Sequence, residues 1–215
     1  LGEALGKRRR QVVVATKAFH RMGRGAHDIG LSRRHLIEAC EASLRRLGTD
    51  WIDLYQVHSF DALVPPEETL RALDDLVQAG KIRYIGCSNF AGWQLSKALG
   101  ISMAEGLSAY VGQQIQYSLV ARTPEQELLP CGIDMGVGAI TWSPLAQGFL
   151  SGKFRDPSAG DTRLELMGAL SAYDNQRCRD VLAAIDGVVA GRDGAVKHRP
   201  AGTNPARARA GGAHR

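Results

Sequence analysis

Apolar and polar positions follow two different periods along this chain. Five short runs, rich in β-branched and aromatic residues, predict buried strands, and their starts lie 25 to 41 residues apart. Between the runs, apolar side chains recur every three or four positions, which is the period of a helix with one buried face. The predicted strands are residues 12–16, 53–57, 82–86, 112–117 and 137–141.

Capping residues mark the ends of the first two predicted helices. Ser32 precedes a run with helical spacing, and Gly48 follows it directly. Pro66 stands in the first turn of the next helix, and Gly80 is its expected stop.

Alternation of strand and helix every thirty or so residues predicts an α/β fold with a parallel sheet covered by helices. Two architectures fit this pattern, the doubly wound sheet and the eight-stranded (β/α)8 TIM barrel. A doubly wound dinucleotide-binding sheet normally carries a G-x-G-x-x-G turn after its first strand, and none of the five runs is followed by one. The pattern therefore favours the barrel.

The composition narrows the class of protein further. With 215 residues and 44% apolar side chains, the chain can bury one sizeable core. It has no apolar run long enough to span a bilayer and no basic-then-apolar leader, so we expect a cytoplasmic protein with no membrane partner. The first residue is Leu1 rather than Met, which indicates that the true beginning lies upstream. The four cysteines stand singly without metal-ligand spacing, so we expect reduced thiols and no metal site.

The net charge of +5 is confined to the end of the chain. Residues 187–215 hold six basic side chains and one acidic side chain, whereas residues 1–186 hold 21 of each. The protein is therefore expected to be a neutral domain with a basic tail. The tail lacks interleaved aromatic residues, so nucleic acid is not an expected partner.

Polar or aromatic residues lie in or directly after the C-terminal part of each predicted strand. Lys17, His58, the sequence CSN at 87–89 and the sequence WSPLAQG at 142–148 come after strands, and Gln114 lies within one. Singly, each has a structural explanation, because a strand-end lysine often extends to solvent and a strand-end histidine is often structural. A barrel, however, places its chemistry at the C-terminal ends of its strands, so their coincidence indicates an active site.

The chain resembles the aldo-keto reductases. The resemblance rests on the following stretches and runs from residue 3 to about 186: VVVATK, LRRLGTDWIDLYQVH, PPEETLRALDDLVQAGKIRYIGCSNF, QIQYSLVAR and ITWSPLAQGFLSGK. The residues in these stretches are similar to those of the bacterial and plant branch that includes the potassium-channel beta subunits. The resemblance implies an incomplete barrel that holds the third strand through the seventh helix.

The same resemblance implies an NADPH-dependent enzyme that moves a hydride to a small-molecule aldehyde or ketone. The family's catalytic lysine falls on Lys17, where its charge would lower the pKa of a catalytic tyrosine. The family's histidine falls on His58, which would donate to the carbonyl oxygen. The cofactor-binding residues fall on Ser88, Asn89 and Gln114 for the carboxamide, Trp142 for stacking, and Ser143, Pro144, Leu145, Gln147, Gly148 and Lys153 for the pyrophosphate.

Two parts of the chain depart from the family pattern. The family's aspartate and tyrosine lie in a stretch like D-T-A-x-x-Y-G, and this form does not occur here. Residues 187–215, rich in Ala, Gly, Arg and Pro, stand in place of the last strand and helix and are typical of disorder. We therefore expect a barrel fragment over residues 1–186, a disordered tail over 187–215, and a frameshift near residues 187–195.

Two functions follow from these expectations. The first is an NADP(H)-dependent oxidoreductase for aldehydes or ketones, here as a partial and impaired gene product. The alternative is a non-catalytic remnant of the barrel fold that acts as a binding or regulatory subunit. Nothing in the sequence determines the oligomeric state.

Overall fold

The computed structural model describes residues 1–155, 168 and 170–190. The chain divides into two compact units. One comprises residues 1–115 and 123–142, and the other comprises residues 116–122 and 143 onward. Each unit is described by itself below.

The first unit is built on a parallel sheet in which the strands follow chain order. Its strands are β1 (Ala15–Ala18), β2 (Ile52–Val57), β3 (Ile82–Ser88), β4 (Tyr110–Gln116) and β5 (Gly138–Trp142). Each of them overlaps one of the five predicted runs. The α/β class is confirmed, and five parallel strands in sequential order are consistent with part of a barrel.

Strand β1 begins three residues later than the apolar run predicted. The N–H of Val14 donates to Asp53 Oδ2 at 2.8 Å, and the Val14 carbonyl accepts from the N–H groups of both Asp53 and Leu54. A side chain thus replaces a backbone partner at this point, and the regular ladder starts at Ala15.

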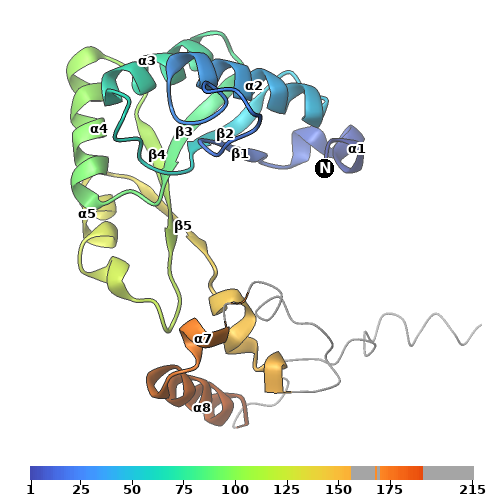
Figure 1. The fold of residues 1–215 in the computed structure, drawn as a ribbon, viewed down its shortest axis with the longest axis vertical. Coiled ribbons are helices and arrows are strands. Elements are labelled where there is room, and N and C mark those ends of the chain that lie inside the picture. Colours follow the sequence, from blue (N-terminus) through green and yellow to red (C-terminus); the bar gives the residue numbers. More distant parts are fainter. Residues whose placement is uncertain (156–167, 169, 191–215) are drawn as a thin grey trace, which may run out of the picture. The chain divides into compact units, whose positions relative to one another are not determined.

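Four helices of this unit cover the sheet on one face (Figure 1). They are α2 (Arg33–Leu47), α3 (Pro66–Gln78), α4 (Gly92–Glu105) and α5 (Leu128–Asp134). The predicted caps are confirmed: Ser32 accepts from the N–H of His35 at 3.3 Å, and Gly48 ends α2 in the left-handed region with φ 61°. The C-cap of α3 is Ala79, and Gly80 follows with φ 71°. The short elements of this unit are α1 (Gly2–Leu5) and the 3₁₀ turns η1 (Gly6–Gln11) and η2 (Thr123–Glu125).

The core lies between the sheet and these helices. Tyr55 is fully buried there, and its hydroxyl donates to the carbonyl of Leu36 in α2 at 3.1 Å. Two neighbours of Tyr55 on the same face are also buried. They are Ile85, its partner in β3, and Val57, two residues later in β2. The helix-facing side of the sheet is therefore closed to solvent at β2 and β3.

Lys17 of β1 and Gln56 of β2 lie on the opposite face of the sheet. Lys17 is paired in register with Gln56, and Gln56 with Gly86. A Cβ at Gly86 would lie 2.8 Å from the carbonyl oxygen of Gly112 and 3.3 Å from Gln56 Cγ. A glycine is required at position 86 because only a missing side chain lets β4 and Gln56 approach so closely.

The second unit has its own small core. It contains η3 (Ala146–Ser151), η4 (Lys153–Arg155), α7 (Leu170–Tyr173) and α8 (Gln176–Ala190). Phe149 and Leu150 pack against Cys178 and Leu182 of α8, and the Phe149 ring stacks on Tyr173 at 5.9 Å. Helix α8 continues to Ala190, four residues past the predicted domain boundary at 186. The rest of the predicted tail lies outside the described residues.

Two further expectations concern cysteines and membranes. All four cysteines are free thiols, and Cys40, Cys87 and Cys178 are buried. Among the helices of the described ranges, none has the length and apolar character that crossing a bilayer demands.

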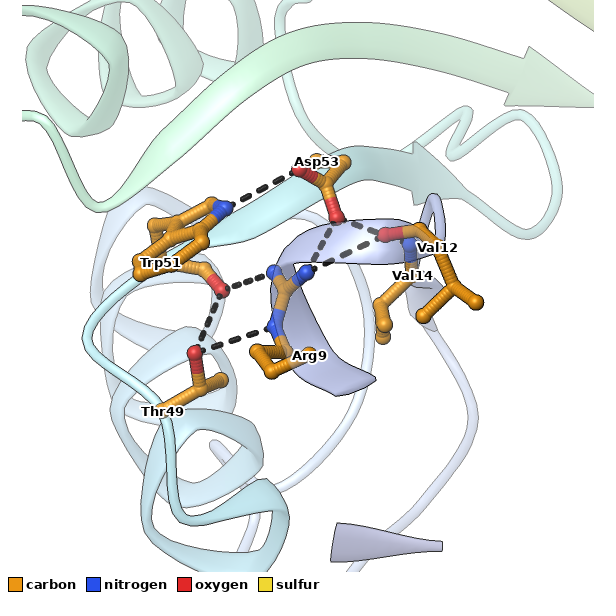
Figure 2. A network of polar contacts seen from close by, with 6 residues as sticks. All are labelled: Arg9, Val12, Val14, Thr49, Trp51 and Asp53. Carbon is orange, nitrogen blue, oxygen red and sulfur yellow. Dashed lines mark hydrogen bonds and ion pairs between the residues drawn. The ribbon is translucent and has the colours of Figure 1, made fainter. Parts of the chain in front are cut away.

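An arginine clasp, formed by Arg9 of η1 and its partners, fastens the start of the chain to the sheet (Figure 2). The Arg9 guanidinium lies 2.8 Å from Asp53 Oδ2, and its other N–H groups donate to Thr49 Oγ1 and to the carbonyls of Val12 and Trp51. It also lies over the Trp51 ring, 4.4 Å from the centroid. Burial opposes ionisation of Asp53, but the hydrogen bonds from Val14, Trp51 and Arg9 and the Arg9 charge lower its pKa below 3.8.

Replacing Arg9→Ala should lower the free energy of unfolding by about 2 kcal/mol, because it leaves a partly buried carboxylate without its charged partner. Denaturant unfolding followed by tryptophan fluorescence measures this loss. Arg8→Ala, an exposed change in the same 3₁₀ turn, is the matched control.

The loss should depend on pH in one direction. Because the folded pKa of Asp53 is lowered, its contribution is present above pH 3.8 and disappears as the pH falls through the folded value. The difference between wild type and Arg9→Ala should therefore shrink in acid. A difference that stays constant down to the lowest pH at which the protein folds would show that the ion pair does not stabilise this unit.

Candidate active site

The C-terminal parts of the five strands place polar and aromatic side chains at one edge of the sheet. Lys17 lies in β1, His58 directly follows β2, Ser88 ends β3 and is paired with Gln114 of β4, and Trp142 ends β5. All five belong to the first compact unit. The structure thus brings together the lysine, the histidine, the carboxamide residues and the tryptophan that the sequence singled out.

His58 is held by its backbone and faces a second histidine. Its N–H donates to the carbonyl of Ala18 at 2.9 Å, and its carbonyl accepts from Asn89 Nδ2 at 3.0 Å. The His20 ring packs edge-on against the His58 ring, with centroids 4.4 Å apart and an interplanar angle of 65°. Sequence reasoning missed His20, although its position two residues after β1 was a usable signal.

The surroundings of His58 favour the neutral form of its ring. Burial lowers the pKa of His58 below 6.5, and the nearby positive charges of His20 and Lys17 lower it further. Burial also lowers the pKa of Lys17. A neutral imidazole has one N–H donor and one acceptor nitrogen, so His58 can donate to an oxygen without carrying charge.

Asn89 braces two neighbours at the same edge. Its Nδ2 donates to the His58 carbonyl, and its Oδ1 accepts from Trp142 Nε1 at 3.2 Å. Its backbone adopts φ 55°, a left-handed conformation that asparagine tolerates better than most residues. One amide hydrogen and one lone pair of Asn89 remain for a ligand, so the predicted carboxamide contact stays compatible with this geometry.

Ser88 and Gln114 offer complementary groups beside Asn89. The Ser88 hydroxyl donates to the Gln114 carbonyl at 3.0 Å, which leaves its oxygen free to accept. The side-chain amide of Gln114 is half-buried and makes no hydrogen bond within the described part of the chain. It can therefore donate to and accept from a ligand amide.

The predicted pyrophosphate residues belong to the second unit. Ser143 and Gln147 have left-handed backbones, with φ 50° and 58°, and Gly148 has φ 102°. The Leu145 carbonyl accepts from the N–H of Gly148 at 2.9 Å, which closes a tight turn. Pro144, Leu145 and Lys153 are exposed. Strained non-glycine residues of this kind concentrate at functional sites, where each costs about 1–3 kcal/mol.

Comparison with known proteins shows which sequences this chain is similar to. A sequence profile described as the Aldo/keto reductase family matches residues 1–188. The chain is 45% identical over 163 residues to "Uncharacterized oxidoreductase YrpG" of Bacillus subtilis, covering 72% of this chain and 49% of that protein. It is 45% identical over 123 residues to "Versiconal hemiacetal acetate reductase" of Aspergillus parasiticus, covering 57% and 36%.

A third relative is named for a different role. The chain is 37% identical over 186 residues to "Probable voltage-gated potassium channel subunit beta" of Arabidopsis thaliana, covering 86% of this chain and 56% of that protein. The chain thus spans about half the length of the curated relatives it matches.

The Asn89 brace can be tested without a ligand. Asn89→Gly removes both side-chain hydrogen bonds while keeping the left-handed backbone, so the Trp142 indole N–H should shift and exchange faster in ¹⁵N NMR. Asn89→Asp keeps the acceptor, so the Trp142 signal should stay near its wild-type position. The Trp93 indole serves as internal control, and an unmoved Trp142 signal in Asn89→Gly would contradict the brace.

The titration of His58 gives a second test. NMR should find its pKa below 6.5, and Lys17→Met should raise it because one of the two neighbouring positive charges is removed. Since the folded value is lowered, the stabilising contribution of neutral His58 is present above 6.5 and is lost as the pH falls through the folded value. A pKa that does not move in Lys17→Met would exclude the proposed electrostatic contact.

Proposed function

The chain belongs to the aldo/keto reductase family of oxidoreductases, and from this we propose that it acts as an NADPH-dependent reductase of small aldehydes or ketones. The observation that carries the proposal is the gathering of Lys17, His58, Gln114 and Trp142 at one edge of a parallel sheet. Such an edge is where barrel enzymes bind their ligands.

The residues at this edge fit the nicotinamide end of the cofactor. Gln114 has an unused side-chain amide, Ser88 has an unused acceptor, and Asn89 keeps one donor and one acceptor position. These groups match the two ends of a carboxamide. The Trp142 ring, held through its N–H, offers a flat apolar surface on which a nicotinamide ring can stack. When bound, NADPH supplies the hydride.

His58 is the residue proposed to act on the carbonyl group. Its neutral ring can donate an N–H hydrogen bond to the carbonyl oxygen, orienting the substrate and stabilising the negative charge that develops on that oxygen. Lys17, on the neighbouring strand, adds positive charge to the same region. Together they stabilise the transition state, in which the carbonyl oxygen carries more negative charge, more than they stabilise the free carbonyl compound.

Reduction of a carbonyl group also needs a proton donor at this edge of the sheet. Tyr55 and Tyr110 are buried against the helices, and burial raises the pKa of each well above 10. Neither can donate a proton to a substrate at the sheet edge. Among the residues gathered at this edge, His58 is our candidate for donating a proton to the carbonyl oxygen.

A second candidate function is a binding subunit without catalysis. Similarity to a protein named as a potassium-channel subunit beta supports it. Cofactor-dependent turnover distinguishes the two candidates, because only the first requires it.

NADPH binding tests the nicotinamide site. Trp142→Ala should weaken NADPH binding about tenfold in a fluorescence titration, because it removes the stacking surface. Trp93→Ala, at an exposed position in α4, is the matched control and should leave the affinity unchanged. No NADPH binding by the wild-type chain, or equal loss in both variants, would overturn the assignment of this edge.

His58 is tested by separating catalysis from binding. Residual NADPH-dependent reduction across an aldehyde panel should fall about a hundredfold or below detection in His58→Ala, as expected for loss of an acid or oxyanion donor. NADPH affinity should remain near wild type. Equal loss of turnover and cofactor affinity would make His58 structural, and no cofactor-dependent turnover by the wild-type chain would favour the non-catalytic candidate.

A further inference from the structure

Helix α4 begins shortly after Asn89, and its N-cap position has no side chain that can accept a hydrogen bond. That position is Ala91, which makes no side-chain cap. The first N–H groups of a helix have no partners within the helix, so they need acceptors from elsewhere. Gln94 Oε1 accepts from the N–H of Ala91 at 2.8 Å. The N–H of Gly92, the first residue of α4, still needs an acceptor.

Glu127 supplies this acceptor from a different helix. Its Oε1 accepts from the N–H of Gly92 at 2.8 Å, although the two residues are 35 positions apart in the chain. Glu127 is the N-cap residue of α5, yet its side chain makes no cap hydrogen bond to α5. A carboxylate at a helix N-terminus is stabilised by the N–H bond and by the positive end of the helix dipole. The Glu127 side chain therefore caps α4 rather than its own helix.

The close contact depends on the missing side chain of Gly92. A Cβ at this position would lie 2.6 Å from Glu127 Oε1 and 2.9 Å from Glu127 Cγ, which is too close for two carbon or oxygen atoms that are not bonded. Because these atoms belong to a flexible side chain, an alanine at position 92 would displace the carboxylate and leave the fold intact. Substitutions at two positions, 92 and 127, can therefore remove the same hydrogen bond.

The start of α5 is itself fixed to β4, the strand that carries Gln114. Gln113 is 2% exposed, and its Nε2 donates to the Leu128 carbonyl at 2.7 Å. A Cβ at Gly132 would lie 2.3 Å from the same nitrogen, so α5 packs directly on the Gln113 side chain. Glu127 immediately precedes Leu128. Its carboxylate therefore connects β4, through the start of α5, to the start of α4.

Asn89 lies between the two points that this connection fixes. Its N–H donates to the Gln114 carbonyl at 3.1 Å, and α4 begins at Gly92. The left-handed backbone of Asn89, with φ 55°, turns the chain from β3 toward α4. The side chain of Phe90 is buried, so the turn stays folded when the connection is broken. The direction of the Asn89 side chain then depends on where α4 is held.

We propose that Glu127 is a positioning residue of the cofactor site: by capping α4 at Gly92, it directs the Asn89 amide toward Trp142 and the nicotinamide carboxamide. This inference rests on the proposed function, because it takes the role of Asn89 in cofactor binding from there. Glu127 is assigned no contact with the cofactor. It acts through the two side-chain hydrogen bonds of Asn89, which join the His58 carbonyl and Trp142 Nε1.

The Trp142 indole reports the direction of Asn89 without any cofactor. In ¹⁵N NMR of the full chain, Glu127→Ala should move the indole signal in the same direction as Asn89→Gly does, because both changes weaken the bond to Asn89 Oδ1. Gly92→Ala should have the same effect by displacing the carboxylate. Glu127→Gln keeps an oxygen that can accept from Gly92, so its Trp142 signal should stay near the wild-type position.

Two controls separate this effect from a general disturbance of the fold. Gln126→Ala, an exposed change next to Glu127, should leave the Trp142 signal in place. The Trp51 indole, which donates to Asp53, should not move in any variant. An unmoved Trp142 signal in Glu127→Ala, or an equal displacement in Glu127→Gln, would overturn the inference.

NADPH titration extends the test to the cofactor. Glu127→Ala should weaken NADPH binding about fivefold, the effect of one misplaced hydrogen bond. In the Asn89→Gly background the same change should have no further effect, because Glu127 acts through Asn89. Losses that add in the double variant would show that Glu127 acts elsewhere, which contradicts the positioning role.

This inference and the proposed function fail in different ways. Absence of NADPH binding by the wild-type chain would overturn the proposed function. The Trp142 signal needs no cofactor, so it still decides whether Glu127 directs Asn89. NADPH binding by the wild type together with an unmoved Trp142 signal in Glu127→Ala would overturn this inference alone.

Discussion

Parallel pairing of consecutive strands is the constraint on which the candidate site depends. Because β1 to β5 run in the same direction and in chain order, the residue that ends each strand arrives at one edge of the sheet. Lys17, His58 and Trp142 are far apart in sequence, but the ladder sets Lys17 near His58, and Asn89 bonds to both His58 and Trp142. Gly86 makes the ladder possible at its tightest point, where the backbone of β4 leaves no room for a Cβ.

Side chains then convert the shared edge into a defined geometry. Asn89 connects the backbone of His58 to the indole of Trp142, so one amide fixes the ends of β2 and β5 relative to β3. Its left-handed backbone is a conformation that asparagine tolerates better than most residues. The arginine clasp around Arg9 acts at the opposite edge, where it orders the residues before β1 (Figure 2). Stability and ligand chemistry are thus assigned to opposite edges of the same sheet, as in barrel enzymes generally.

Much of the fold and part of the site could be predicted from local pattern. The capping roles of Ser32 and Gly48 depend only on neighbouring residues, and the five strands follow from apolar runs of sufficient length. The late start of β1 could not be predicted, because it results from the carboxylate of Asp53, 39 residues away from Val14. The continuation of α8 to Ala190 was likewise missed, since the composition after residue 186 suggested disorder although Val188 and Val189 extend the helix.

The sequence by itself determined the α/β class and the order of the elements and indicated candidate site residues, because these follow from short stretches. Only the tertiary structure decided which of those residues meet. It joined His20 to His58 and gave Asn89 its two side-chain hydrogen bonds. Such contacts depend on distances of a few ångströms between segments far apart in the chain, and these distances are set by strand register and helix packing rather than by local composition.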